Sequence, residues 1–279
     1  MTRGPVLVTG SGGRLGGALQ RVGASGTAMI AMTGSRGDDP ERRLDVTDAR
    51  STLATISAIK PAVIVHLASI VGRECENDPD NAARVNVGGT AAILAAAQTA
   101  GVERLVFIST AAVYGDRRRR PVSEQDSTDP TGVYAMTKLK AEEALASSAG
   151  DVAVDVLRVF NVYGPEMPDS LVTRLQIASA DAPAHLTGLD GFVRDYVHVD
   201  DVARAILCAA ESDSVGFRVL NVGSGIPRSN RDLLDSLPQV SREAVVIGSE
   251  VDSYSCADIT AISTDLGWSP REPWPPADR

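Results

Sequence analysis

The sequence of 279 residues has few of the side chains that bind structural metals or form disulfides, because it contains only three cysteines and three histidines. They are widely separated, at Cys75, Cys208, Cys256, His66, His185 and His198. An odd number of cysteines without metal-ligand spacing excludes a disulfide framework and offers no metal motif. We therefore expect no structural metal and a reduced, cytoplasmic compartment.

Basic charge and long apolar runs are also scarce. The 27 Lys and Arg residues are outnumbered by 36 Asp and Glu, which gives a net charge of -9. Because phosphate backbones bind to basic faces, we exclude nucleic acid as a partner. The short basic run Arg117–Arg120 is interpreted as solvated. No apolar run reaches the roughly 18 residues of a membrane span, and the first residues lack the apolar core of a signal peptide.

What the sequence does contain is an alternation of short apolar runs and longer helical patterns. The expected strands are Pro5–Gly10, Ala28–Thr33, Ala62–Ala68, Arg104–Thr110 and Ala153–Phe160. Their apolar residues are nearly continuous, as in parallel strands that are covered on both faces. The clearest helices between them are Ala82–Ala100 and Val133–Ser148. Repeated strand–helix–strand units predict an α/β fold with a doubly wound parallel sheet.

A glycine pattern follows the first strand and opens the next helix. The stretch VTGSGGRLGG places Gly10, Gly13 and Gly16 three residues apart. In this position glycines let the backbone approach a pyrophosphate at a helix N-terminus. A flexible turn is the alternative interpretation, but the context favours dinucleotide binding and, with the sheet, predicts a Rossmann domain.

The alternation of strands and helices weakens after Phe160, so we expect two parts. Residues 1–160 form the predicted dinucleotide-binding Rossmann domain, and residues 161–279 form a small C-terminal lobe for the substrate. We expect 193–223 to return from this lobe to the Rossmann domain.

The end of the second strand indicates which dinucleotide binds. A carboxylate there usually binds the ribose of NAD, but MTGSRGDD puts Ser35 and Arg36 first and Asp38 later. A carboxylate about 4 Å from a 2′-phosphate would cost on the order of 4 kcal/mol. Ser35 and Arg36 could instead donate hydrogen bonds worth about 1.5–3 kcal/mol. We expect NADP(H) in preference to NAD(H), unless the loop shifts Asp38 closer or Arg36 is only an exposed loop residue.

Tyr134 and Lys138 lie four residues apart in the stretch GVYAMTKLKAEEAL and share one face of the expected helix. They are either an ordinary amphipathic pair or a phenol whose proton is controlled by a neighbouring ammonium. The segment alone leaves both interpretations open.

Nine motifs bear on this choice and follow one another in the order TGSGGRLGG, LDVTD, HLAS, NVGGT, FISTAAVYG, YAMTK, LRVFNVYGP, VRDYVHVDDVARAI and NVGSG. In kind and order they resemble the extended short-chain dehydrogenase/reductase family, which includes sugar-nucleotide epimerases, dehydratases and ketoreductases. They span nearly the whole chain, which makes the resemblance more specific than any single motif.

The resemblance implies a catalytic set of Thr110, Tyr134 and Lys138. The implied cofactor-binding residues are Gly10, Gly13, Arg14, Leu15 and Gly16 in the glycine loop, Asp45 and Val46 at the adenine, Leu67, Ala68 and Ser69 on the nicotinamide side, and Tyr134 and Lys138. The implied substrate contacts are Ser69, Thr110, Asn161 and Arg194.

The implied chemistry is a proton transfer that accompanies hydride transfer. A phenol with an unperturbed pKa near 10 is ionised in only about one molecule in a thousand at pH 7. We expect Lys138 to lower the pKa of Tyr134, so that the phenol exchanges a proton with a substrate oxygen while hydride moves to or from the nicotinamide. Thr110 would hydrogen-bond the same oxygen, and Lys138 would also hold the nicotinamide ribose.

Residues near the implied catalytic set limit which of the family's reactions this chain can catalyse. Dehydratases of the family carry Asp-Glu where this chain has Ala111 and Ala112, and members that epimerise carbons beside a ketone carry cysteine and histidine where it has Ala112 and Glu166. Ketone reduction and C4 epimerisation through a transient ketone remain. Because Ser35 and Arg36 favour NADP(H), we expect an NADP(H)-dependent reductase of a nucleotide-linked keto-sugar. An NAD-dependent sugar-nucleotide C4 epimerase is the alternative, and a non-catalytic NADP-binding regulator is the third candidate.

Which residues bind the phosphate groups of the substrate, and whether the substrate has them, stays open. The resemblance implies that Arg194 binds a pyrophosphate, whereas an ion pair with Asp195 or Asp200 is the alternative. Many members of the family add an arginine shortly before the position of Asp258, but SEVDSYSCAD has none. A free sugar therefore stays open as the substrate.

Two further expectations concern partners. Arg119 or Arg120 could replace the arginine that is missing before Asp258, because both lie in the earlier basic run. The resemblance also implies a homodimer through the helices Ala82–Ala100 and Val133–Ser148.

Overall fold

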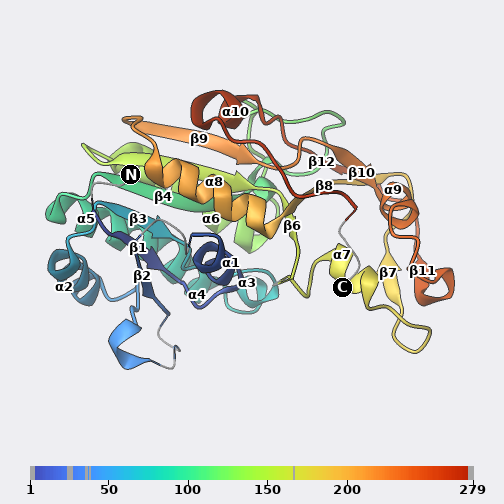
Figure 1. Ribbon diagram of the computed structural model, residues 1–279, viewed down its shortest axis with the longest axis horizontal. Coiled ribbons are helices and arrows are strands. Elements are labelled where there is room, and N and C mark those ends of the chain that lie inside the picture. The colour runs from blue at the N-terminus through green and yellow to red at the C-terminus, as the bar shows by residue number, and fades with distance from the viewer. Residues whose placement is uncertain (1–3, 24–27, 35–36, 38, 166, 276–279) are drawn as a thin grey trace.

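The computed structural model describes residues 4–23, 28–34, 37, 39–165 and 167–275. Its centre is a six-stranded parallel sheet in the order β2-β1-β3-β4-β5-β9 (Figure 1). The strands are β1 (Val6–Thr9), β2 (Met29–Met32), β3 (Val63–His66), β4 (Arg104–Thr110), β5 (Ala153–Val159) and β9 (Phe217–Val222). The first five coincide with the expected apolar runs to within two residues at each end, and the doubly wound α/β fold is confirmed.

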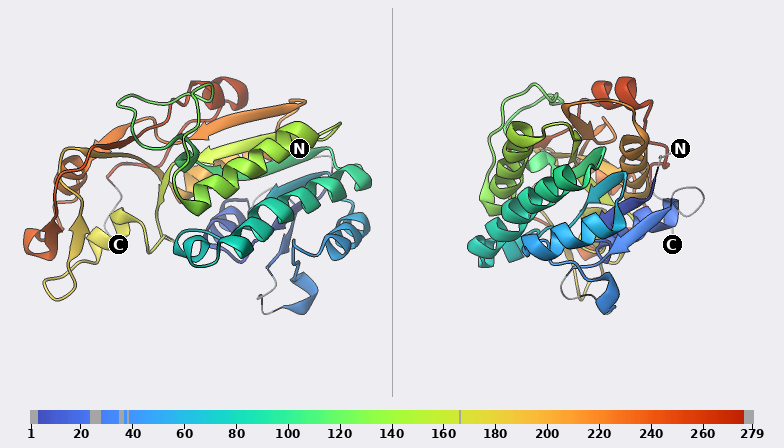
Figure 2. Two further views of the ribbon diagram at one scale, coloured as in Figure 1. Left: turned by 180° about the vertical axis from the view of Figure 1, so that it is seen from behind. Right: turned by 90° about the vertical axis from the view of Figure 1, so that its left-hand side faces the viewer.

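Helices cover both faces of this sheet. The helices α1 (Arg14–Gly23) and α8 (Val199–Glu211) pack together on one face, and α2 (Ala49–Ile59), α5 (Thr90–Ala100) and α6 (Gly132–Ser148) lie on the other (Figure 2). The strands are apolar on both sides for this reason. In β1, Val6 and Val8 pack into the cluster with α1 and α8, whereas Leu7 packs into the cluster with α2, α5 and α6.

The helix expected over Ala82–Ala100 is helical throughout, but it is not regularly α-helical. A short helix α3 (Arg73–Asn77) is followed by α4 (Pro79–Ala83), which continues through a π-helical segment, Arg84–Gly89, into α5. The π-helical turn is not visible in the apolar pattern of the sequence. π-helical turns are frequent at functional sites, and this one carries Asn86, whose side chain is described below.

The smaller lobe is built on a second sheet. In it β8 (Phe192–His198) pairs with β6 (Asn161–Tyr163), β10 (Pro227–Ser229) and β12 (Ser253–Ser255), while β7 (Ala184–Leu186) pairs with β11 (Val245–Ile247). The helices of this lobe are α7 (Leu171–Gln176) and α9 (Asn230–Asp235), whereas α10 (Thr260–Leu266) packs beside β9 at the edge of the large sheet. Figure 1 shows this lobe at one end of the molecule, beyond the carboxyl ends of the large sheet's strands.

The chain passes between the two sheets more than once. Within 193–223, α8 packs on the large sheet and β9 joins its edge, but β8 pairs in the smaller sheet. The returning segment therefore starts with α8 and not with β8. The division of the chain into domains at residue 160 stays a prediction.

Within the part of the chain that the structure describes, short 3₁₀ turns lie at Pro40–Arg42, Ala111–Tyr114 and Arg242–Ala244. Among the described residues, none of the helices combines the length and apolar character that crossing a membrane would require.

Candidate active site

The glycine loop joins the end of β1 to the start of α1. Gly10 has a φ of +69°, and a Cβ added there would lie 2.5 Å from the backbone nitrogen of Ala68. A Cβ on Gly16 would collide with the backbone of Ser11. Gly10 requires glycine because side chains rarely adopt that φ and because the backbone of Ala68 leaves no room for one, and Gly16 requires it because the backbone of Ser11 leaves no room. These close approaches place the loop after β1 against the loop after β3.

The shape and polarity of this loop fit a pyrophosphate. Gly13 is exposed, and the first N–H groups of a helix lack partners within it. The Ser11 hydroxyl is buried without a hydrogen-bond partner among the described residues, so a polar group is available to a ligand. Arg14 is exposed and pairs with Asp169, whereas Leu15 packs against the core. The strand order reverses between β1 and β3, which is where doubly wound sheets bind dinucleotides.

The residues expected at the adenine lie beyond β2. Asp45 Oδ1 accepts hydrogen bonds from the Thr47 hydroxyl (2.7 Å) and N–H (2.9 Å), and these bonds lower the pKa of Asp45. Val46 is buried. Ser35 and Arg36, on which the preference for NADP(H) was based, lie outside the described residues, so this preference gains no structural support.

The nicotinamide-side residues Leu67, Ala68 and Ser69 follow β3 and are half-buried. The hydroxyl of Ser69 donates to Asn86 Oδ1 at 3.0 Å, and the same oxygen accepts from the N–H of Ile70 at 2.8 Å. This segment is therefore held by a side chain from the π-helical turn.

Asn86 is a positioning residue that sequence reasoning missed. Its amide nitrogen donates to the carbonyl of Ile70 and to the hydroxyl of Thr137, both at 3.0 Å. Thr137 in turn donates to the carbonyl of Tyr134 at 2.9 Å. Asn86 thus connects the loop after β3 to the helix that carries Tyr134. It lies in the NVGGT motif, but its partners are distant in sequence and gave no local signal.

The three residues of the expected catalytic set come from two neighbouring elements. Thr110 ends β4, and its hydroxyl accepts from the N–H of Ala112 at 3.2 Å. Tyr134 and Lys138 lie one turn apart on α6, which packs against β4. Lys138 is only 2% exposed, and Tyr134 packs against a small cluster that contains Cys75.

Burial controls the protonation of this pair. Burial, and to a lesser extent the nearby Cys75 thiol, raises the pKa of Tyr134 above the usual value for a phenol. Burial lowers the pKa of Lys138 to about 7, although the Glu142 carboxylate opposes this shift. The expectation that Lys138 lowers the pKa of Tyr134 is therefore not met in the protein alone, because the loss of hydration is the main influence on this pKa.

A pocket of about 200 Å³ opens at the carboxyl ends of β4 and β5. Its lining includes Thr110, Asn161 and Arg194, so the structure brings three of the four expected substrate contacts to one cavity. Ser69 is not part of this lining. Asn161 donates its amide to the carbonyl of Asp195 at 3.3 Å, which fixes its side chain at the junction with the smaller sheet.

Arg194 is held without either of the ion pairs considered in the sequence analysis. Its guanidinium donates to the Ser253 hydroxyl at 2.6 Å, lies 3.5 Å from an Asp116 oxygen and stacks 3.8 Å from the Phe192 ring centroid. Asp195 instead accepts from backbone N–H groups such as that of Ala257. Burial lowers the pKa of Arg194 from its usual value, and the Asp116 carboxylate opposes this shift. A cation with one carboxylate neighbour therefore lies at the wall of the pocket.

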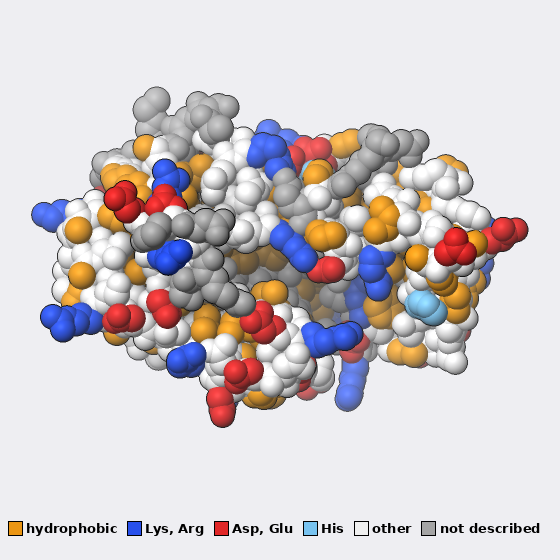
Figure 3. All heavy atoms as spheres, turned by 90° about the horizontal axis from the view of Figure 1, so that it is seen from below, with side chains coloured by type: hydrophobic (Ala, Val, Ile, Leu, Met, Phe, Trp, Pro, Cys, Tyr) orange, Lys and Arg blue, Asp and Glu red, His pale blue; other side chains and the backbone are white. Residues whose placement is uncertain are grey.

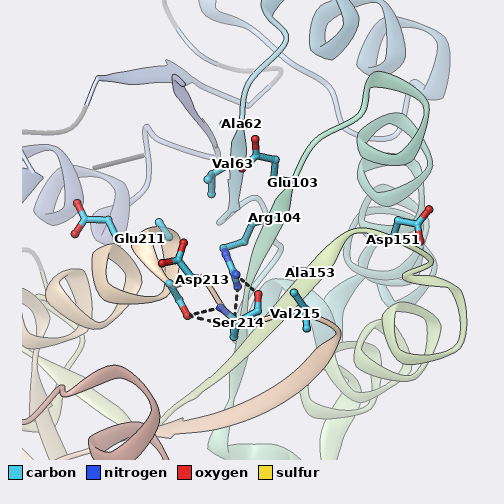
Figure 4. Close-up of a pocket in the computed structure, with 12 residues that line it drawn as sticks. Ala62, Val63, Glu103, Arg104, Asp151, Ala153, Glu211, Asp213, Ser214 and Val215 are labelled. Carbon is cyan, nitrogen blue, oxygen red and sulfur yellow. Dashed lines mark hydrogen bonds between the residues drawn. The ribbon is translucent and has the colours of Figure 1, made fainter. Parts of the chain in front are cut away.

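A larger cavity of about 390 Å³ lies at the opposite end of the sheet (Figure 4). Arg104 at its wall donates to Asp155 and to the carbonyl of Ser214. Ligands of doubly wound sheets bind outside the carboxyl ends of the strands. Because this cavity opens at the amino ends and its arginine is already paired, we do not assign the reaction to it.

One group of possible metal ligands lies between α8 and the C-terminal segment. The ligand atoms of His198, Asp200 and Glu272 lie within 4.8 Å of one another. Asp200 pairs with Arg21 and Glu272 with Arg204. The two guanidinium groups already neutralise both carboxylates, so the group carries no metal assignment.

Charges of both signs are interspersed with apolar side chains on the face shown in Figure 3. The surface of this face is hollowed near its middle. Such a mixed pattern contrasts with the continuous basic face that binds nucleic acid.

The glycine loop at the switch point, followed by Thr110 and by Tyr134 and Lys138 on one helix, defines a class: dinucleotide-binding α/β enzymes of the extended short-chain dehydrogenase/reductase type. The comparison with known families agrees with this class. The chain belongs to the NAD-dependent epimerase/dehydratase family, whose sequence model matches residues 6–223.

Individual relatives are similar over most of the chain. A UDP-glucose 4-epimerase of Rhizobium leguminosarum bv. trifolii is 31% identical over 263 residues, which covers 83% of this chain and 80% of the relative. The solved structure of MoeE5 in complex with UDP-glucose and NAD has 30% identity and a TM-score of 0.84, covering 97% and 95% of the two chains. UDP-glucose 4-epimerase from Brucella ovis in complex with NAD has 26% identity and a TM-score of 0.85, covering 96% and 94%.

Proposed function

We propose that this protein is a sugar-nucleotide 4-epimerase that works with NAD, and that a UDP-hexose is its substrate. The observation that carries the proposal is the similarity to UDP-glucose 4-epimerases along most of the chain. The combination of Thr110, Tyr134 and Lys138 with alanines at 111 and 112 is compatible with it. This set can move one proton at a carbinol oxygen but has no second acid or base after the threonine. C4 epimerisation needs no more than that.

The comparisons support the epimerase alternative better than the NADP(H)-dependent reductase that we expected. The curated relative reported above is a 4-epimerase, and the two solved structures contain NAD. The preference for NADP(H) depended on Ser35 and Arg36, which follow a short strand at the edge of the sheet. A single loop pattern there is weaker support than similarity along the whole chain.

The chain's own residues have distinct roles in this proposal. When bound, NAD⁺ supplies a hydride acceptor and a positive charge. As a phenolate, which the positive charge of bound NAD⁺ would favour, Tyr134 would accept the proton of the 4-hydroxyl and return it to the same oxygen, and the Thr110 hydroxyl would orient that oxygen. Burial brings the pKa of Lys138 to about 7, so its ammonium loses a proton more easily than an exposed lysine does. It can therefore hold or release a proton beside Tyr134 at little cost.

Other residues of the site bind phosphate groups or hold the catalytic segments in position. Gly10, Gly13 and Gly16 bind the pyrophosphate of the dinucleotide through the loop backbone. Asn86 fixes the loop that contains Ser69 against the helix that contains Tyr134. Asn161 and Arg194 bind the sugar-nucleotide at the wall of the pocket.

The proposal is tested by incubating the purified protein with UDP-galactose and following UDP-glucose by NMR. We expect conversion to an equilibrium mixture without net formation of NADH, and we expect NAD to be retained by the purified protein. Oxidation of NADPH with a UDP-4-keto-6-deoxy sugar, and no conversion of UDP-galactose, would favour the reductase. Binding of a dinucleotide without turnover of either substrate would favour the regulator.

A further inference from the structure

The four consecutive arginines Arg117–Arg120 are divided by the fold into two pairs with different environments. Arg118 donates to the carbonyls of Tyr114 (2.9 Å) and Ser127 (2.8 Å), and so fastens the loop that follows β4. Arg120 makes two hydrogen bonds to the carboxylate of Asp126, at 2.9 and 2.5 Å. These two arginines are occupied by the loop itself.

The other two arginines, Arg117 and Arg119, line a separate pocket of about 250 Å³ between this loop and the smaller lobe. The backbone of Arg117 forms a parallel bridge with Tyr254, and the N–H of Tyr254 donates to the carbonyl of Asp116 at 2.7 Å. The loop is therefore attached to β12. The backbone of the arginine run therefore has a fixed position opposite residues of the smaller lobe.

The pocket of Arg119 adjoins the pocket that contains Thr110, Asn161 and Arg194, and Asp116 belongs to the lining of both. The hydroxyl of Ser253, in the Arg119 pocket, is the group to which Arg194 donates. A path thus runs from the proposed reaction centre past Arg194 to Arg119.

The acidic residues that line the Arg119 pocket, Asp116, Asp190 and Asp252, already have partners. Asp116 pairs with Arg194 and accepts a hydrogen bond from the Ser253 hydroxyl. Arg119 pairs with Asp252, and both side chains are 73% exposed. Asp190 is held by two hydrogen bonds from Arg231, at 2.7 and 2.8 Å. Exposed ion pairs contribute little to stability, so an anion that arrives at Arg119 can displace Asp252 easily, whereas Asp190 stays neutralised.

We propose that Arg119, together with Arg194, binds the diphosphate that links sugar and nucleoside, and that Asp252 is a counterion which the diphosphate displaces. This inference rests on the proposed function, because only a nucleotide-linked sugar places a diphosphate beside the sugar pocket. A guanidinium suits this role, since its planar fork binds phosphate oxygens in pairs. Between Arg119 and Arg120, the two candidates from the sequence, the structure favours Arg119.

The test replaces either the cation or the anion of the Arg119–Asp252 ion pair. UDP is titrated calorimetrically into the purified full chain at low ionic strength, with Arg119→Ala and Asp252→Asn compared with the unaltered protein. We expect UDP to bind about tenfold more weakly to Arg119→Ala and more tightly to Asp252→Asn, since the competing carboxylate is gone. A pair that is merely structural predicts the same small effect from both variants, and that result would overturn the inference.

A matched control uses another exposed ion pair of the lobe, Arg242 with Asp235, whose side chains are 61% and 63% exposed. Arg242→Ala removes one positive charge from a residue that does not line the pocket, and we expect it to bind UDP like the unaltered protein. An equal loss in Arg242→Ala and Arg119→Ala would mean that only net charge matters, and would also overturn the inference.

Epimerase assays on the same variants separate this inference from the proposed function. We expect Arg119→Ala to raise KM for UDP-galactose about tenfold with kcat little changed. If the unaltered protein epimerises UDP-galactose and Arg119→Ala behaves identically, the function stands and the diphosphate site is wrong. If the unaltered protein binds UDP through Arg119 but converts no UDP-galactose, the site stands and the function is wrong.

Discussion

The ammonium of Lys138 lies 4.0 Å from the centroid of the Phe107 ring, in the interior of the domain between α6 and β4. An aromatic face and the Glu142 carboxylate only partly replace the water that this cation loses. The buried cation is therefore costly to the fold, and it lies one helical turn from the phenol of Tyr134.

Lys138→Met is expected to change how stability depends on pH. The pKa of Lys138 falls from 10.5 to about 7 on folding, so between these values the unfolded chain binds a proton that the folded chain does not. Stability contributed by this group therefore rises with pH across that window, and the cost of burial is greatest below pH 7.

The measurement is the melting temperature of both proteins between pH 7 and 10. The unaltered protein should be less stable than Lys138→Met at pH 7, and the difference should shrink as the pH rises. Melting temperatures of the two proteins that change in parallel with pH would contradict the lowered pKa of Lys138.

Gly10→Ala is expected to destabilise the fold and to abolish retention of the dinucleotide. The new Cβ would meet the backbone of Ala68 at a φ of +69°, and such combined strain and overlap costs about 1–3 kcal/mol or more. Gly17→Ala is the matched control, because a Cβ at this helical position of α1 meets nothing within 4 Å.

Gly17→Ala should raise stability by about 0.5–1 kcal/mol. Urea unfolding and the absorbance of bound cofactor report on both variants. Equal effects of the two substitutions would contradict the close approach between the loops.

Asn86→Ala is expected to cost about 1–3 kcal/mol, because it leaves the buried N–H of Ile70 without its partner. It should also lower kcat more than it raises KM for the sugar-nucleotide, since it loosens the loop of Ser69 relative to Tyr134. Loss of stability with an unchanged kcat would show that Asn86 has no part in positioning the site.

The homodimer stays a prediction that light scattering can test. On the face of α5 that the structure leaves exposed, Ala91 and Ala95 are small enough to permit close packing of two copies. Ala95→Arg should convert a dimer to a monomer. The melting temperature of the variant should be little changed. A monomeric mass for the unaltered chain would contradict the prediction, as would a dimer that survives Ala95→Arg.

Features that depend on neighbours in sequence could be predicted, whereas features that depend on distant contacts could not. The runs that became β1 and β4 are apolar because both faces are covered, and the spacing of Tyr134 and Lys138 fixes them on one side of α6. The π-helical turn around Asn86 depends on partners such as Thr137, 51 residues away.

The electrostatics of the site were predicted in the wrong direction for the same reason. Burial of Tyr134 and Lys138 is set by elements packed around α6, and nothing in the YAMTK motif reports it. The division of the arginine run likewise depends on Asp126 and Asp252, and the second of these is more than a hundred residues away. The sequence therefore names the motif residues as candidates, and their roles stay predictions. Their protonation and their supporting contacts could not be predicted from it.

The most direct test of the proposed function follows the hydrogen at carbon 4 of the sugar. UDP-galactose labelled with deuterium at that carbon is incubated with the protein, and the UDP-glucose formed is analysed by mass spectrometry, with Tyr134→Phe as the comparison. We predict that the label stays at carbon 4 of the product and that Tyr134→Phe forms product at least about a hundredfold more slowly. Product without the label, or undiminished turnover by Tyr134→Phe, would contradict the account.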